Sequence, residues 1–135
     1  TAEMNARQSN ILILDTVGML SQLYRYAWVT YVGGGLSRTG IHNVLEAAVF
    51  GKPVLFGPNH SAYIEAKGLV EAGGGWVIAE SEAVEKLLEQ WKANPVDYAQ
   101  TSEAAAAFVR RYSGATEIIM DFIQENRLLT SKSNC

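Results

Sequence analysis

Short runs of consecutive apolar residues recur along the chain and are separated by segments of different periodicity. Four such runs, at residues 11–14, 28–32, 54–56 and 76–79, are rich in β-branched or aromatic residues. Each run is closed by polar or turn-forming residues, which is typical of strands buried on both faces of a parallel sheet. The pattern therefore predicts four short parallel strands.

Between these runs the apolar positions recur at helical spacing. Residues 19–27, 44–49 and 61–72 each carry such a pattern, and Gly51 is a suitable stop for the second helix. Alternation of strands and helices predicts an α/β fold of the doubly wound type, in which helices cover both faces of a parallel sheet.

The second half of the chain is predicted to be helical after the fourth strand. Apolar residues follow Ser81 at positions i, i+3, i+4 and i+7, so Ser81 is expected to cap a helix that ends at Asn94-Pro95. A further helix is expected over residues 104–112. After a break at Ser113-Gly114, an apolar stripe predicts a second closing helix.

Composition fits one ordinary globular domain. The 135 residues are 48% hydrophobic and 19% charged, with a formal net charge of −3. Lys and Arg are scattered, which argues against nucleic acid as a partner. No apolar run approaches the roughly 18 residues of a spanning helix, so we expect no membrane insertion by this segment. The single cysteine, Cys135, fits a reducing, cytoplasmic setting.

The loop after the second predicted strand is the most informative candidate site. Ligands bind open parallel sheets at the carboxyl ends of the strands. Here Gly33-Gly34-Gly35 leaves the strand, and Gly40-Ile41 leads through His42 and Asn43 toward a helix that carries Glu46. Glycines permit positive φ angles and close approach to a ligand, and their amides can form a nest for an anion. A flexible turn is the alternative interpretation.

Two common phosphate-binding motifs are excluded by single residues. Arg38 stands where a dinucleotide fingerprint needs glycine, and Ile41 follows Gly40 where a P-loop needs lysine. The chain is therefore expected to be neither a dehydrogenase nor a P-loop enzyme.

The spacing of His42, Asn43 and Glu46 predicts that they share one face of the helix. Free amides and the helix dipole favour a phosphate there, the dipole by about 0.3 to 1 kcal/mol. A carboxylate would repel that phosphate. Glu46 is better suited to a neutral diol such as a ribose, with about 1.5 to 3 kcal/mol for each charge-assisted hydrogen bond. The alternatives are that Glu46 only complements the dipole and His42 only caps the helix.

Other polar residues are weaker candidates for the same cleft. An Asx turn, a solvated arginine or an ordinary loop explains each of them equally well. They are Asp15, Thr16, Gly18, Met19, Arg38 and Asn59. No pair of acids, Ser-His-Asp set or cluster of metal ligands stands out, so the sequence assigns neither a catalytic residue nor a metal site.

The motifs around this loop closely resemble those of 3-deoxy-D-manno-octulosonic acid (Kdo) transferases. The first is the run from Val32-Gly33-Gly34-Gly35 to Gly40-Ile41-His42-Asn43-Val44-Leu45-Glu46, followed by Gly51-Lys52-Pro53-Val54. The second is Asp15-Thr16-Val17-Gly18-Met19-Leu20. Their order and spacing agree with the family, and the resemblance is strong over about residues 11–80.

The resemblance implies a fold and an activity. Members of this family have two Rossmann-like domains of the GT-B type, and the C-terminal domain holds the sugar nucleotide. Residues 1–127 are thus expected to be part of that C-terminal domain, and 128–135 a polar tail, in a fragment of a longer protein. The implied donor is CMP-Kdo. The implied acceptor is a lipid A precursor at the cytoplasmic face of the inner membrane of a Gram-negative bacterium, in lipopolysaccharide biosynthesis.

The resemblance also implies roles for particular residues. The glycine loop with Ile41, His42 and Asn43 would contact the donor phosphate and sugar, and Glu46 would hold the ribose. Transfer in the family inverts the anomeric centre without a metal ion or another cofactor. Its general base is an acid of the N-terminal domain, so this fragment alone is expected to be inactive.

Two departures from the family pattern concern the donor contacts. Met19 stands where a glutamate is usual, and Gly35 stands where a serine is common. The alternatives are another GT-B protein that uses a UDP-sugar, either a transferase or a 2-epimerase, and a non-catalytic α/β binding module.

Overall fold

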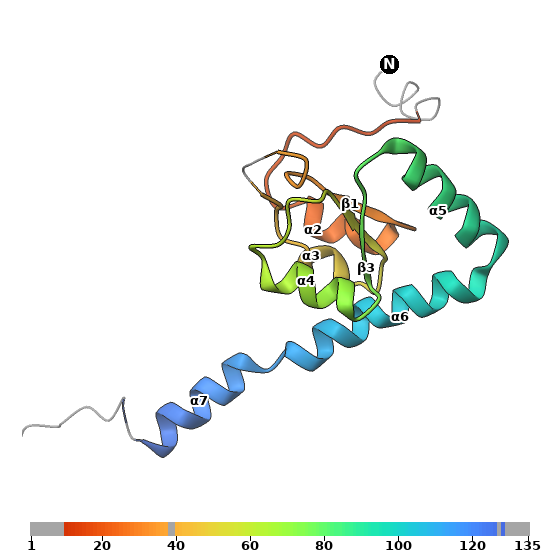
Figure 1. Ribbon diagram of the computed structural model, residues 1–135. Helices are drawn as coiled ribbons and strands as arrows, with labels where there is room; N and C mark the ends of the chain where they lie inside the picture. The colour runs from red at the N-terminus through yellow and green to blue at the C-terminus, as the bar shows by residue number, and fades with distance from the viewer. Residues whose placement is uncertain (1–9, 38–39, 127, 129–135) are drawn as a thin grey trace, which may run out of the picture.

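The computed structural model describes residues 10–37, 40–126 and 128, and within them it contains one three-stranded sheet (Figure 1). The strands are β1 (Thr30–Val32), β2 (Val54–Phe56) and β3 (Gly75–Val77), in the order β1-β2-β3. Both pairings are parallel, with Tyr31 opposite Leu55 and Leu55 opposite Trp76. The predicted α/β fold with a parallel sheet is confirmed.

The helices connect the strands and then close the chain. They are α2 (Leu20–Leu23), the 3-10 helix η1 (Tyr24–Tyr26), α3 (Leu45–Ala48), α4 (Ile64–Glu71), α5 (Ser81–Ala93), α6 (Pro95–Tyr112) and α7 (Ala115–Glu125). Helix α3 joins β1 to β2, and α4 joins β2 to β3. The carboxyl ends of β1 and β2 therefore lead, through loops, into α3 and α4.

Alternation of side chains along the strands divides the core between two faces of the sheet. Val32, Val54 and Phe56 lie on one face. They pack with buried residues of α3, α4 and α6, namely Ala47, Ala48, Ala66, Leu69 and Ala105. On the other face Leu55 packs with Ile78 and with Leu87 and Trp91 of α5. Helices thus cover both faces, as the doubly wound prediction requires.

Four aromatic residues join α5 and α6 to the segments around β1 and β3. The Trp91 ring is edge-on to Trp28, Trp76 and Tyr98, with centroids 6.4, 5.9 and 5.9 Å away. Tyr98 stacks on Trp28 and donates a 2.7 Å hydrogen bond from its hydroxyl to the Trp28 carbonyl. Edge-on and offset aromatic pairs add to the energy of area burial. This cluster holds the C-terminal helices against the sheet.

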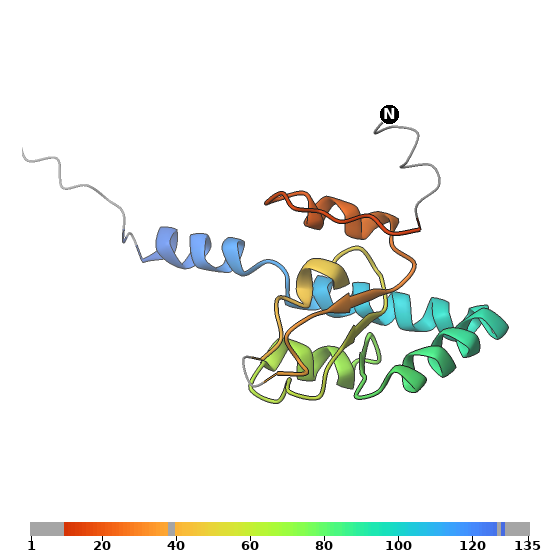
Figure 2. The same ribbon diagram turned by 90° about the horizontal axis from the view of Figure 1, so that it is seen from above.

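The predicted strand over residues 11–14 is wrong. This segment forms no strand and is drawn at the outside of the molecule in Figures 1 and 2. Ile11 and Ile13 are 79% and 84% exposed. Within the described residues β1, β2 and β3 pair with one another in sequence order, and residues 11–14 pair with none of them.

The helical predictions need two corrections in the second half of the chain. Helix α6 begins at Pro95 rather than at residue 104, because the Asn94 side chain accepts a hydrogen bond from the Val96 amide at 3.3 Å and proline suits the first helical position. Ser81 is the first residue of α5 and does not cap it; Glu80 precedes the helix without a side-chain bond. The predicted break at Ser113-Gly114 is present, with Gly114 at a φ of +97°.

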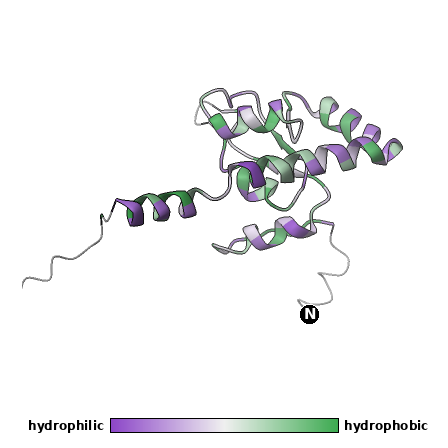
Figure 3. Ribbon diagram, turned by 90° about the horizontal axis from the view of Figure 1, so that it is seen from below, coloured by the Kyte–Doolittle hydropathy of each residue, from purple (hydrophilic) through white to green (hydrophobic). Residues whose placement is uncertain are grey.

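Helix α7 projects away from the rest of the molecule (Figures 1 and 2). Its apolar residues gather on one side (Figure 3), and none of its residues is buried. Ile118 and Phe122 are 71% and 58% exposed. Within the part of the chain that the structure describes, no helix combines the length and apolar character needed to cross a bilayer.

Replacing Trp91 by alanine is expected to lower the free energy of unfolding by about 3 to 5 kcal/mol. The reason is that Trp91 is only 1% exposed and contacts three other aromatic rings. Urea denaturation followed by circular dichroism measures the change. Lys92→Ala, at the exposed neighbouring position of the same helix, is the control and should change stability by less than about 0.5 kcal/mol. Equal effects of the two changes would contradict the assigned core.

Candidate functional site

The loops that follow β1 and β2 are packed together through glycine backbones. Gly35 and Gly57 are both buried. A Cβ atom on Gly35 would lie 2.7 Å from the Gly57 nitrogen and 2.8 Å from its Cα, closer than real Cβ contacts. Gly34 has a φ of +92°, and a Cβ there would overlap the Gly40 carbonyl. These glycines were predicted to let a ligand approach closely. In the structure Gly35 lets the two loops pack against each other, and Gly34 lets its own loop fold back on Gly40.

Hydrogen bonds reinforce this packing and occupy some of the amides that were expected to bind an anion. The Asn59 amide donates to the Gly35 carbonyl at 2.9 Å, and the Asn59 side chain donates to the Ser37 carbonyl at 3.0 Å. The His42 amide donates to the Gly33 carbonyl at 3.1 Å. Asn59 is thus a brace between the loops, and the amides of Asn59 and His42 are not available to a ligand.

Helix α3 starts later than predicted. Its first residue is Leu45 and Val44 precedes it, so His42 and Asn43 lie before the helix rather than in its first turn. Asn43 accepts a hydrogen bond from the Leu45 amide at 3.0 Å and donates one to Glu46 Oε1 at 3.2 Å. Within the described residues, the amides of Asn43 and Val44 donate no hydrogen bond. The amides of Asn43 and Val44 are therefore the ones in this segment that an anion would use.

Glu46 is exposed, and Asn43 fixes one of its carboxylate oxygens. The other oxygen has no hydrogen bond within the described residues. Ile41, by contrast, is buried and belongs to the core. Of the residues predicted from the sequence, the structure brings Asn43 and Glu46 together directly.

Tyr24 is a neighbour of Glu46 that the sequence did not point to. Burial raises the pKa of the Tyr24 phenol, and the negative charge of Glu46 raises it further. Tyr24 belongs to η1 and packs against the core that includes α3. The helical period placed Tyr24 in the core, but nothing in the sequence indicated which charged residue it would approach.

The motif at Asp15 to Met19 is a turn that leads into α2. Gly18 has a φ of +91°, and the Thr16 hydroxyl donates to the Met19 sulfur at 2.9 Å. Asp15 is exposed. The thioether occupies the position of the glutamate that is usual in this motif, and it accepts the local hydrogen bond. Arg38, the remaining weaker candidate, lies outside the described residues.

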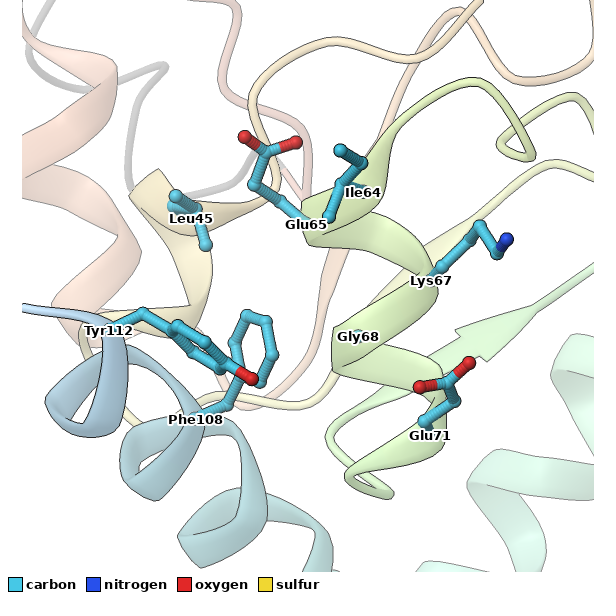
Figure 4. Close-up of a pocket in the computed structure, with 8 residues that line it drawn as sticks. All are labelled: Leu45, Ile64, Glu65, Lys67, Gly68, Glu71, Phe108 and Tyr112. Atoms are coloured by element: carbon cyan, nitrogen blue, oxygen red, sulfur yellow. The ribbon is translucent and has the colours of Figure 1, made fainter.

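Two cavities lie beside α3 and α4. A cavity of about 360 Å³ is lined by His42 and Asn43 and, from the start of α4, by Tyr63 and Glu65. A larger one of about 500 Å³ lies between α4 and the end of α6 and is bounded by Phe108 and Tyr112 (Figure 4). The larger cavity contains none of the residues predicted from the sequence. Tyr63 and Glu65 were not predicted, because they follow a different strand from the glycine loop.

Within the described residues, no group of three or more His, Cys, Asp or Glu side chains is placed to hold a metal ion. The residues gathered at the candidate site include His42, Asn43, Tyr63 and Glu65 around the cavity, and Glu46, which Asn43 contacts.

Curated proteins with related sequences are mainly Kdo transferases. The chain is 30% identical to the 3-deoxy-D-manno-octulosonic acid transferase of Bordetella pertussis over 117 residues, which are 86% of this chain and 27% of that protein. It is 33% identical to the enzyme of the same name from Aquifex aeolicus over 84 residues, 61% of this chain and 24% of that protein. By sequence the chain is similar to Kdo transferases over most of its own length. It spans about a quarter of the length of these relatives.

A solved structure is similar in fold to this chain. It is the C-terminal CMP-Kdo binding domain of WaaA from Acinetobacter baumannii, with a TM-score of 0.64 and 23% sequence identity. The match covers 71% of this chain and 51% of that domain. A bifunctional glycosyltransferase/methyltransferase of Fusobacterium nucleatum is 27% identical over 90% of this chain and 16% of that protein. No family model matches the chain.

Gly35→Ser, which restores the residue common in Kdo transferases, is expected to lower the free energy of unfolding by about 1 to 3 kcal/mol. The added atoms would meet the Gly57 backbone and the Ile41 side chain. Thermal and urea unfolding measure the loss. Gly33→Ala is the matched control, since a Cβ there would meet only the His42 ring at 3.8 Å, an ordinary contact. A Gly35→Ser variant as stable as the control would refute the proposed close packing of the loops.

Glu46→Gln should lower the pKa of the Tyr24 phenol while leaving it above the ordinary value of 10.0. Removing the charge of Glu46 eliminates the smaller cause of the upward shift, and burial, the larger cause, remains. NMR titration of chains with labelled tyrosine, with Tyr24→Phe to assign the signal, measures the change. Glu71→Gln serves as the control. A pKa of Tyr24 that does not respond to Glu46→Gln would place the carboxylate elsewhere.

Proposed function

We propose that this chain is the larger part of the C-terminal, donor-binding domain of a Kdo transferase and that it binds CMP-Kdo. The observation that carries the proposal is the pair Asn43 and Glu46 at the carboxyl end of β1. Glu46 presents an exposed, oriented carboxylate there, next to the amides of Asn43 and Val44. The names of the relatives and the shared fold support the choice of donor.

Each part of the nucleotide has a suitable group in this arrangement. The carboxylate of Glu46 would accept hydrogen bonds from the two ribose hydroxyls, since a carboxylate is a strong acceptor for neutral donors. The phosphate would bind at the amides of Asn43 and Val44, with His42 beside it. The braced glycine loop would hold these groups in place before the donor arrives, which reduces the cost of ordering on binding.

For the whole protein we propose inverting transfer of Kdo to a lipid A precursor at the cytoplasmic face of the inner membrane of a Gram-negative bacterium, in lipopolysaccharide biosynthesis. The donor would react without a metal ion or a prosthetic group. The general base would be an acid of the N-terminal domain. Because the chain spans about a quarter of its relatives, we propose that it binds donor but does not catalyse transfer alone.

A second candidate is another glycosyltransferase of the same fold that uses a UDP-sugar. The match to a bifunctional glycosyltransferase/methyltransferase over 90% of this chain favours the broader class of glycosyltransferases. It does not indicate which pyrimidine the donor nucleotide carries. The two candidates differ in the pyrimidine that the site accepts, so a choice between nucleotides separates them.

Titration with CMP and UMP is expected to show tighter binding of CMP, by about tenfold if one hydrogen bond to the cytosine amino group decides the preference. Isothermal titration calorimetry on the chain gives both dissociation constants. Equal affinities, or tighter binding of UMP, would rule against CMP-Kdo as the donor and favour the second candidate.

The control for this experiment tests the site itself. Glu46→Ala should weaken CMP binding by about tenfold or more, because it removes charge-assisted hydrogen bonds to the ribose. Glu89→Ala, an exposed glutamate on α5, should leave the affinity unchanged. Unchanged CMP affinity in Glu46→Ala would mean that the ribose binds elsewhere.

A further inference from the structure

A cavity of about 320 Å³ lies at the opposite edge of the sheet from the loops that follow β1 and β2. The turn at Ala72-Gly73, which leads into β3, forms one side of it, and α5 and α6 form the others (Figure 1). Because the three strands are parallel, the start of β3 and the ends of β1 and β2 lie at opposite edges. The cavity therefore shares no residue with the groups assigned to the nucleotide.

Trp76 gives this cavity an accessible aromatic surface. It lines the cavity from β3 and is 37% exposed. The buried Trp91 ring meets it edge-on, with the centroids 5.9 Å apart, and so holds the indole in place. The neighbouring lining residues Gly73 and Ala104 carry little or no side chain. An apolar face of a small ring can therefore stack on Trp76.

Polar side chains of α5 and α6 line the same cavity. Gln90 Nε2 donates to Asp97 Oδ2 at 3.1 Å, which joins the two helices and orients the carboxylate. Within the described residues this bond leaves the other Asp97 oxygen and the Gln90 carbonyl without a partner. Gln100, three residues after Asp97 on α6, is exposed and adds a second amide. The cavity thus offers hydrogen-bond donors and acceptors beside the indole.

The charge of the lining narrows the class of ligand. Among the described residues that line the cavity, Asp97 alone is charged, so phosphate and carboxylate groups are repelled. A simple cation would leave the N–H groups of Gln90 and Gln100 unused. Hydroxyl groups both donate and accept, so they match the carboxylate and the amides together. The ligand that fits is a neutral ring with several hydroxyls and one apolar face.

We propose that this cavity binds a neutral sugar ring, which stacks on Trp76 and forms hydrogen bonds with Asp97, Gln90 and Gln100. Ligand pockets begin at about 300 Å³, so the volume suits one ring and not an oligosaccharide. The site goes beyond the proposed function and does not depend on it, because it uses a different edge of the sheet and excludes the charged donor.

The test is an NMR titration of the ¹⁵N-labelled chain with methyl β-D-glucopyranoside. It is followed at the indole N–H of Trp76, which Trp76→Phe assigns. We expect saturable binding with a dissociation constant of about 1 to 10 mM, as a ligand of this size gives weak affinity. Methyl β-D-glucuronide, which has the same ring with a carboxylate, and tetramethylammonium, a cation without hydroxyls, should each bind at least about fivefold more weakly.

Variants test the assigned contacts. Asp97→Asn and Gln100→Ala should each weaken the glucoside by about threefold or more. Asp97→Asn should also narrow the difference between glucoside and glucuronide, because the repelling charge is gone. Lys92→Ala, on α5 but outside the cavity, is the matched control and should leave the affinity unchanged. Thermal unfolding checks that each variant is folded.

The possible results separate this inference from the proposed function. No saturable shift of the Trp76 indole below about 100 mM glucoside would overturn the sugar site. Glucuronide or tetramethylammonium that binds as well as the glucoside would also overturn it, and so would unchanged affinities in both Asp97→Asn and Gln100→Ala. A chain that binds no CMP but shows the predicted glucoside selectivity would contradict the proposed function and support this site.

Discussion

The candidate site depends on one main-chain contact, that of Gly35 with Gly57. Parallel pairing of β1 with β2 brings the ends of both strands to one edge of the sheet, with Val32 opposite Phe56. The loops that leave these ends can come together only because neither glycine carries a side chain. Asn59 then joins them with two hydrogen bonds. The positions of His42 and Asn43, and of the helix that carries Glu46, follow from this contact.

The contact also decides which groups remain for a ligand. Bracing the loops uses the amides of His42 and Asn59, so the glycine loop is a support more than a broad anion nest. Asn43 has three contacts at this point, since it accepts a hydrogen bond from the Leu45 amide, donates one to Glu46 and lines the neighbouring cavity. Asn43 therefore links Glu46 on α3 to the wall of that cavity.

Local patterns predicted much of the fold, and their failures have a common cause. The strand over 54–56 and the break at Ser113-Gly114 were predicted where the structure has them. Residues 11–14 carry an apolar pattern like that of β2, yet they form no strand, because a strand needs a neighbour to supply hydrogen bonds. Capping chemistry at Asn94 likewise started α6 earlier than its apolar pattern indicated.

By itself the sequence determined the alternation of strands and helices, the family resemblance and the placement of Gly35, Asn43 and Glu46 at one strand end, because each is encoded in adjacent or regularly spaced residues. Only the tertiary structure decided that Gly35 packs on Gly57, that Tyr24 approaches Glu46, and that Tyr63 and Glu65 share a cavity with His42. These contacts join segments that follow different strands. Sheet pairing and core packing bring them together, and no local periodicity carries that information.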